Sequence, residues 1–222
     1  IEFKSCSILA SVYALRMLGM FLILPIFAIY ATNLDSNPTS LQIGLALGIY
    51  GLTQAIFQIP FGMSSDYFGR KKVIYFGLLL FIIGSLIAGY STSIEGIILG
   101  RSIQGSGAIS AVLTALLADI TREEQRTKAM AIIGASIGLT FALSLVLSPW
   151  LNDVIGVDGI FILMAILSFT AFLLVYFFIK EPEIRKEKTK TSADEFLKIL
   201  KDINLFRMNF GIFVLHATQI SM

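Results

Sequence analysis

Long stretches without a charged residue are the feature that most constrains how this chain can fold. Four of them contain no Asp, Glu, Lys or Arg: residues 36–65, 73–94, 129–152 and 159–179. Residues 5–34 and 96–118 each contain a single arginine. A helix that crosses a bilayer needs about 20 mostly apolar residues, whereas a strand of a membrane barrel needs only about 9–11. Run length therefore predicts an all-α integral membrane protein.

The composition excludes several other classes of protein. Hydrophobic residues make up 56% and charged residues 14% of the chain, against roughly 45–50% and 25% in ordinary soluble domains. Cys6 is the only cysteine, which excludes a disulfide framework, and there are too few ligands for a zinc cluster. The net charge of +2 provides no strongly basic surface of the kind that binds nucleic acid. We expect the lipid bilayer as the surroundings, and no metal, cofactor or nucleic acid as a partner.

We expect six complete spans, at residues 8–32, 41–61, 73–90, 94–117, 128–150 and 159–179. The predicted domains are a six-helix transmembrane bundle over 1–180, a cytoplasmic linker over 181–208 and the start of a seventh transmembrane helix over 209–222. In the linker, apolar residues spaced i, i+3, i+4 and i+7 predict an amphipathic helix over 192–203. The chain does not begin with Met and stops within a span, so we expect more helices after it.

Lys and Arg residues gather on one side of this predicted topology. The loops at 33–40, 91–93 and 151–158 contain none, whereas the loops after spans two and four and the segment after span six are rich in them. Cytoplasmic loops carry such an excess. The distribution predicts a multi-pass protein of the cell (inner) membrane with a cytoplasmic N-terminus.

Helix-start signals agree with the spans. Four segments fit the capping box, a hydroxyl residue followed three residues later by Glu or Gln: Thr39–Gln42, Thr92–Glu95, Thr121–Glu124 and Ser192–Glu195. The first three lie where a predicted span begins, and the fourth lies at the start of the amphipathic helix. We therefore expect each hydroxyl to cap a helix.

The loop after span two contains a patterned set of glycines and charges. Gly62 and Gly69 permit close approach and positive φ in a tight turn, and Asp66 and Arg70 are near enough to pair. A tight turn with inside-positive charges is the simpler interpretation. The spacing G-x-x-x-D-x-x-G-R-K resembles motif A of the major facilitator superfamily, which lies between helices two and three. Ser64 and Tyr67 depart from it, replacing the usual Leu and Arg.

Span four contains the second motif. An arginine inside the membrane is costly and is a functional candidate by default. Arg101 and Gln104 are three residues apart and share a helix face, and Gly105 and Gly107 let a neighbouring helix approach closely. The segment resembles motif B of the same superfamily. The alternative is a structural arginine that donates to backbone carbonyls.

Span five resembles the antiporter motif of that superfamily only in part. Gly134 and Gly138 have the first spacing of that motif, but Leu139 stands where Pro belongs. A second register places Pro149 in the motif, with Asn152 and Asp153 in place of two glycines. We expect Gly134, Gly138 and Pro149 to take part in helix packing. The G-x-S-x-G pattern around Ser136 would be the nucleophile elbow of a hydrolase only at a strand-to-helix turn, so an intramembrane serine hydrolase is a remote alternative.

The resemblance, which is to the drug:proton antiporter branch, implies a twelve-helix fold of two six-helix bundles, each made of two inverted three-helix repeats. This chain would be the N-terminal bundle, the linker and the start of helix seven. The implied function is secondary active transport of a small solute by alternating access, with proton-coupled efflux, in a monomer and without enzyme activity. A uniporter, a symporter and a channel-like permease are the alternatives. The resemblance also implies a charge network of Asp66, Arg70 and Asp119 at the cytoplasmic ends of the helices.

The predicted substrate or proton pathway consists of Arg16, Gln54, Arg101 and Gln104. Arg16 lies eight residues past Ile8, about 12 Å into the membrane, and Gln54 lies about 10 Å from the same side. We expect Arg16 to face the central cavity and to meet a substrate anion, water or an acid from the other half. The alternative is an arginine that is satisfied by Gln54 and backbone carbonyls.

Overall fold

The computed structural model describes residues 2–32, 34, 38–179 and 202–221. The chain divides into two compact units, residues 1–182 and 183–222. In the second unit the described element is helix α9 (Ile203–Ser221), which begins before residue 209, where the seventh span was expected to start. The predicted amphipathic helix over 192–203 falls almost entirely outside the described residues.

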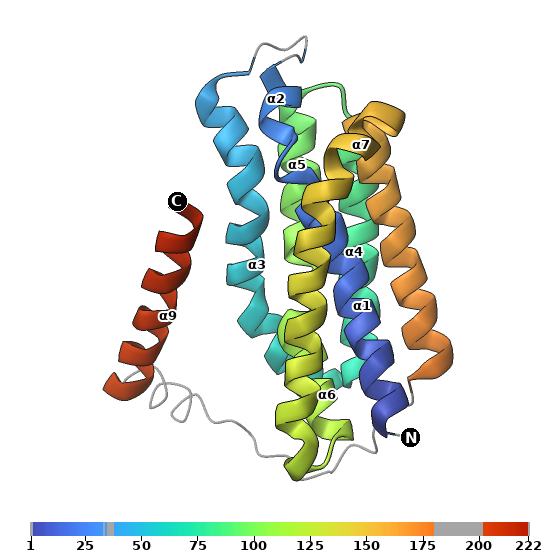
Figure 1. Cartoon of the computed structure of the whole chain (residues 1–222), viewed down its shortest axis with the longest axis vertical. Helices are drawn as coiled ribbons and strands as arrows, with labels where there is room; N and C mark the ends of the chain where they lie inside the picture. The colour runs from blue at the N-terminus through green and yellow to red at the C-terminus, as the bar shows by residue number, and fades with distance from the viewer. Residues whose placement is uncertain (1, 33, 35–37, 180–201, 222) are drawn as a thin grey trace. The chain divides into compact units, whose positions relative to one another are not determined.

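The first unit is a bundle of helices that run side by side along one axis (Figure 1). Its helices are α1 (Glu2–Ile23), α2 (Phe27–Thr32), α3 (Ser40–Phe68), α4 (Arg70–Tyr90), α5 (Ile94–Ser106), α6 (Ser110–Ile120) and α7 (Glu123–Phe178). Five stretches in the described residues are long and apolar enough to cross a membrane, one of them formed by α5 and α6 together and another by the whole of α7. The all-α prediction is confirmed.

Helix α7 contains both of the last two predicted spans. Its 56 residues are interrupted at Gly156, whose φ of 69° lies in the left-handed region that favours glycine. In Figure 1 the chain rises along the first part of α7 (yellow) and returns along the second part (orange). The predicted loop over 151–158 is therefore helical except at this one reversal.

Two predicted spans are broken. Span one divides into α1 and α2 at residues 24–26, where Pro25 offers no backbone N–H to continue the helix. Span four divides into α5 and α6 at residues 107–109. There the backbone N–H of Gly107 donates to the Gln104 carbonyl and that of Ile109 to the Gly107 carbonyl, a tighter pattern than the α-helix.

The capping predictions have different outcomes. Thr39 forms the predicted box with Gln42. The cap of α5 is Ser93, one residue after the predicted Thr92, and its hydroxyl accepts from the backbone N–H of Gly96. The third prediction is wrong: Thr121 ends α6, and its hydroxyl lies 3.5 Å from the Cys6 thiol instead of capping α7. The fourth box lies outside the described residues.

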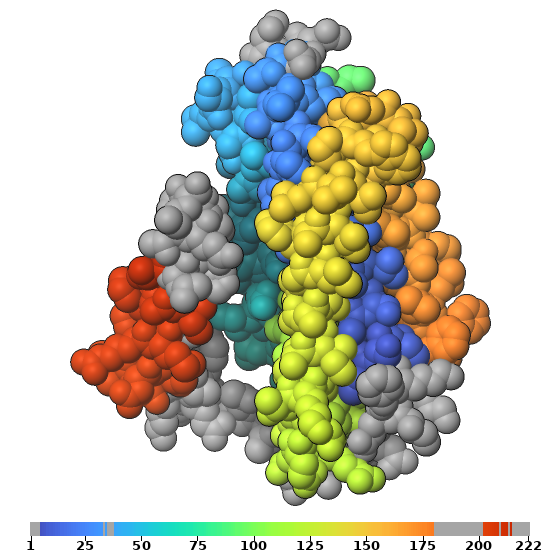
Figure 2. Space-filling view, in the orientation of Figure 1, coloured from blue at the N-terminus to red at the C-terminus, as the bar shows by residue number. Residues whose placement is uncertain are grey.

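Apolar side chains fill the bundle along its length in two clusters, one around Leu9, Leu78 and Leu113 and the other around Leu22 and Phe161. Helix α1 packs along α7, and α4 packs against α5 and α7. Many large apolar residues remain exposed on the outside, including Leu139, Val146 and Trp150 on the first part of α7, which lies open along one face in Figure 2. Such a surface suits lipid or another apolar partner.

Candidate functional site

A cluster of charged side chains lies where α3 passes into α4. Helix α3 continues to Phe68, so the turn expected from Gly62 onwards is reduced to Gly69, whose φ is 101°. Because only glycine takes that conformation without strain, Gly69 has the predicted role. Gly62 lies inside the helix instead, and a Cβ there would meet nothing within 4 Å among the described residues.

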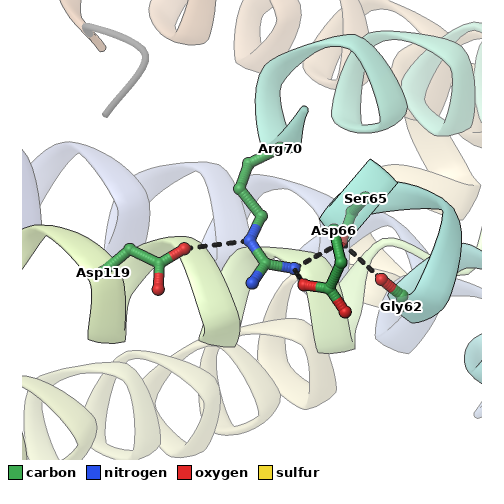
Figure 3. Close-up of polar contacts among 5 residues, drawn as sticks. All are labelled: Gly62, Ser65, Asp66, Arg70 and Asp119. Atoms are coloured by element: carbon green, nitrogen blue, oxygen red, sulfur yellow. Dashed lines mark hydrogen bonds and ion pairs between the residues drawn. The ribbon is translucent and has the colours of Figure 1, made fainter. Parts of the chain in front are cut away.

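Arg70 is the centre of this cluster, and it joins three helices (Figure 3). Its Nη1 lies 2.5 Å from Oδ1 of Asp66 on α3, and its Nε donates to Oδ2 of Asp119 on α6 at 2.9 Å. Nη1 also donates to the Ser65 hydroxyl at 2.6 Å. The structure therefore brings together the three charged residues that the motif predicts.

The cluster is partly open to solvent. The Arg70 side chain is 17% exposed, whereas those of Asp66 and Asp119 are 64% and 40% exposed. Solvent screens exposed ion pairs, which contribute at most about 1 kcal/mol each. The pairs can therefore be made and broken at modest cost, which suits a contact that exists in one conformation and not in another.

Arg16 lies in the interior of the bundle, 1% exposed. Its Nη1 donates to the Ser110 hydroxyl and its Nη2 to the Gly107 carbonyl, both at 2.8 Å, while Nε is buried without a hydrogen-bond partner among the described residues. These acceptors lie at the break between α5 and α6. Gln54 also reaches Ser110, at 3.4 Å, so the two predicted residues meet through a serine rather than directly.

Arg101 lies in a second buried network nearer the other end of the bundle. Its Nε donates to the Ala46 carbonyl and its Nη1 to Oε1 of Gln104, both at 3.3 Å, and its guanidinium lies 4.9 Å from the Tyr50 ring centre. Gln104 in turn donates to the Ser85 hydroxyl at 2.7 Å. The pairing of Arg101 with Gln104 on one face is confirmed.

Sequence reasoning missed three serines that serve as acceptors for these polar side chains: Ser65, Ser85 and Ser110. All three are buried. A serine in an apolar helix usually bonds to its own backbone, so the sequence offers no signal that separates them from the others. Ser65 alone lies inside a motif.

The predicted packing glycines separate into two groups. A Cβ at Gly105 would collide with the Tyr50 carbonyl on α3, and one at Gly107 with the Gly77 carbonyl on α4, so these two allow close helix contact as expected. At Gly134 and Gly138 a Cβ would meet nothing within 4 Å, so neither packs against a described helix of the bundle. That Gly134 and Gly138 allow close helix packing therefore stays a prediction, which would need a partner outside the described residues. Pro149 lies inside α7.

The G-x-S-x-G segment is helical, since Ser136 lies within α7 and its hydroxyl donates to the Ile133 carbonyl. This differs from the elbow that a nucleophile requires.

The family profile described as Major Facilitator Superfamily matches residues 9–221 of the sequence. The chain belongs to the major facilitator superfamily. The inner membrane transport protein YajR of Escherichia coli (strain K12) is 47% identical over 215 residues, which cover 96% of this facilitator and 47% of YajR. The tetracycline resistance protein, class B, of Escherichia coli is 29% identical over 192 residues, which cover 86% of this chain and 48% of that protein.

Solved structures show the same fold. The xylose transporter XylE from E. coli, in its inward open conformation, has a TM-score of 0.68 at 16% identity, covering 100% of this facilitator and 57% of XylE. A peptide transporter POT has a TM-score of 0.71 at 15% identity, covering 98% of this chain and 46% of that one. The predicted N-terminal half of a facilitator fold is confirmed, in a family of transporters rather than enzymes. The facilitator spans about half the length of the curated relatives it matches.

Proposed function

We propose that this chain is half of a secondary active transporter that moves a small solute across the cell membrane by alternating access, with proton-coupled efflux as its mode. The observation that carries the proposal is the position of Arg70, whose side chain holds together the ends of α3, α4 and α6. Membership of the superfamily supports it, and so does the similarity to tetracycline resistance proteins. In this proposal the protein works as a monomer with its N-terminus in the cytoplasm.

The charge cluster acts as a switch in this mechanism. Asp66 and Asp119 each keep much of their surface open, so their oxygens remain available to donors from the other half of the protein. When the cytoplasmic ends of the two halves come together, the cluster joins that contact, and when they separate it is exposed to water. Breaking one of these exposed ion pairs would shift the balance of states by up to about 1 kcal/mol, or about fivefold in population.

The buried arginines form the proposed pathway. Arg16 and Arg101 carry charge into an apolar interior, and their partners among the described residues are serine, glutamine, backbone carbonyls and aromatic rings. Gln54 is only half buried, so it links Arg16, through Ser110, to the open side of α3. Arg16, Gln54, Arg101 and Gln104 remain our candidates for contact with substrate or protons. Arg16 already donates to the Ser110 hydroxyl and the Gly107 carbonyl. These bonds favour the alternative that Arg16 is a structural arginine, satisfied inside the bundle, more than its position in the sequence did.

The test is solute flux in vesicles with the full-length protein, measured with and without a proton gradient. Asp66→Asn should keep expression and lose flux. Asp153→Asn is the matched control, because Asp153 is an exposed carboxylate at the opposite end of the bundle, on α7. Flux that ignores the gradient would indicate a uniporter, inward flux with protons a symporter, and flux that does not saturate a channel-like permease. Wild-type flux in Asp66→Asn would make the cluster merely structural.

A further inference from the structure

Ser65 is the buried member of the charge cluster. Ser65 is 1% exposed, whereas the side chains of the two carboxylates that pair with Arg70 are 64% and 40% exposed. The residue lies in the last turn of α3, one position before Asp66 and four before the joint at Gly69. The sequence pattern assigns no role to this position.

The Ser65 hydroxyl has a defined direction. It donates its single proton to the Gly62 carbonyl, three residues earlier, at 2.6 Å. A hydroxyl has one donor and two acceptor lone pairs, so its lone pairs are left to face away from the helix carbonyl. Arg70 occupies that side, with Nη1 at 2.6 Å from the oxygen (Figure 3).

The guanidinium of Arg70 is planar and rigid, and its own side chain tethers it at the Nε end, so holding Nη1 as well sets the direction of the Nε–H bond. With Nη1 held at Ser65, Nε points to Asp119 on α6. Asp66 cannot fix the group in this way, because an exposed carboxylate changes rotamer at little cost and its attraction is screened. A buried acceptor within the same helix is held by packing.

We propose that Ser65 is a positioning residue of the conformational switch: its hydroxyl aims Arg70 across the joint between α3 and α4 so that the arginine reaches Asp119. The inference rests on the proposed function, in which the charge cluster is the switch. It assigns to Ser65 the orientation of Arg70, which neither carboxylate provides. Without the hydroxyl, Arg70 keeps its charge and its bond to Asp66 but loses the direction that links α3 to α6.

The test uses the full-length protein with Cys6 replaced by Ser and one cysteine at residue 123, where the Glu123 side chain is 84% exposed at the start of α7. The alkylation rate of that cysteine reports how open the cytoplasmic end is, even in variants that do not transport. Ser65→Ala should raise the rate by roughly three- to tenfold, the range expected when a hydrogen bond to a charged group is lost near solvent. Ser65→Cys has nearly the same size but is a poor acceptor, so the cysteine at residue 123 should react as fast as in Ser65→Ala. Because this variant carries a second thiol, the alkylation of residue 123 is followed on its own proteolytic peptide.

A double-mutant cycle separates positioning from packing. If Ser65 acts through Arg70 on Asp119, then Ser65→Ala should add little to the rate of Asp119→Asn, whereas independent effects would add. Ser64→Ala is the matched control, because Ser64 is the neighbouring serine and, in the described part of the chain, Arg70 bonds to Ser65 and not to Ser64. The unfolding temperature, measured in parallel, detects a loss of packing.

Each outcome is decisive. A raised rate in Ser65→Ala and Ser65→Cys that is absent from the Asp119→Asn background supports the proposal. An unchanged rate in Ser65→Ala, a wild-type rate in Ser65→Cys, or full additivity with Asp119→Asn overturns it. If Asp119→Asn alone leaves the rate unchanged, the proposal that the charge cluster is a switch is wrong. That result differs from one in which Asp119→Asn raises the rate and Ser65→Ala does not, which overturns only the role of Ser65.

Discussion

Arg16 donates from Nη1 to the hydroxyl of Ser110 at 2.8 Å, which joins α1 to the first residue of α6. Its Nη2 donates to the Gly107 carbonyl beside it, at the break that separates α5 from α6. In an uninterrupted helix that carbonyl would accept from the backbone N–H four residues later. The buried arginine and the interruption of the helix therefore explain each other.

Ser110→Ala should destabilise the bundle. It removes an acceptor from a buried guanidinium, and a buried donor left without a partner costs about 1–3 kcal/mol. The purified full-length protein should unfold at a lower temperature. Ser106→Ala is the control, because the Ser106 hydroxyl donates only to a carbonyl of its own helix. Equal effects from the two substitutions would contradict the pairing with Arg16.

Arg16→Gln separates transport from stability. If Arg16 belongs to the pathway, the variant should fold and insert but lose flux or change its pH dependence. If Arg16 only supports the break between α5 and α6, the variant should be less stable while each folded molecule transports normally. The measurement is flux and its pH profile per folded molecule. An unchanged profile would remove Arg16 from the pathway.

Gln104→Leu should be more harmful than Gln54→Leu. Gln104 is fully buried and bonds to both Arg101 and Ser85, so leucine would leave two polar groups without these partners. The expected cost is about 1–3 kcal/mol. Gln54 is half buried and makes one longer bond, of 3.4 Å. Thermal unfolding compares them, and equal stability would argue against the network around Arg101.

Gly105→Ala should disrupt the bundle, and Gly138→Ala should not. The added methyl at Gly105 would collide with the Tyr50 carbonyl, which belongs to the backbone of α3 and cannot turn aside. A methyl at Gly138 would meet no other part of the described structure within 4 Å. We expect a large loss of folded Gly105→Ala in a detergent-solubilised expression assay. Comparable yields for the two variants would mean that α3 and α5 are further apart than described.

The proposed orientation can be checked with single cysteines in a background without Cys6. A cysteine at Asp153 should react with an impermeant reagent added to intact cells, and one at Tyr67 should not. Both residues are exposed, so burial does not explain a difference. Reaction at Tyr67 without permeabilisation would reverse the topology.

The charged residues show how far motif spacing can predict a site. Asp66 and Arg70 are only four residues apart, on either side of the turn at Gly69, so their proximity can be predicted from the sequence, and the motif resemblance supplied Asp119. Ser65 has no such signal, because its role depends on where its hydroxyl points after α3 and α4 meet at Gly69.

The sequence by itself determined the helical class and the approximate positions of the apolar helices, because both follow from the length of apolar runs and the cost of placing charge in lipid. Only the tertiary structure decided the partners of the buried arginines and the breaks in spans one and four. Those depend on contacts between residues about 90 positions apart, such as Arg16 with Ser110 and Gly107. A local pattern cannot specify which carbonyl or hydroxyl a long side chain will meet once helices pack.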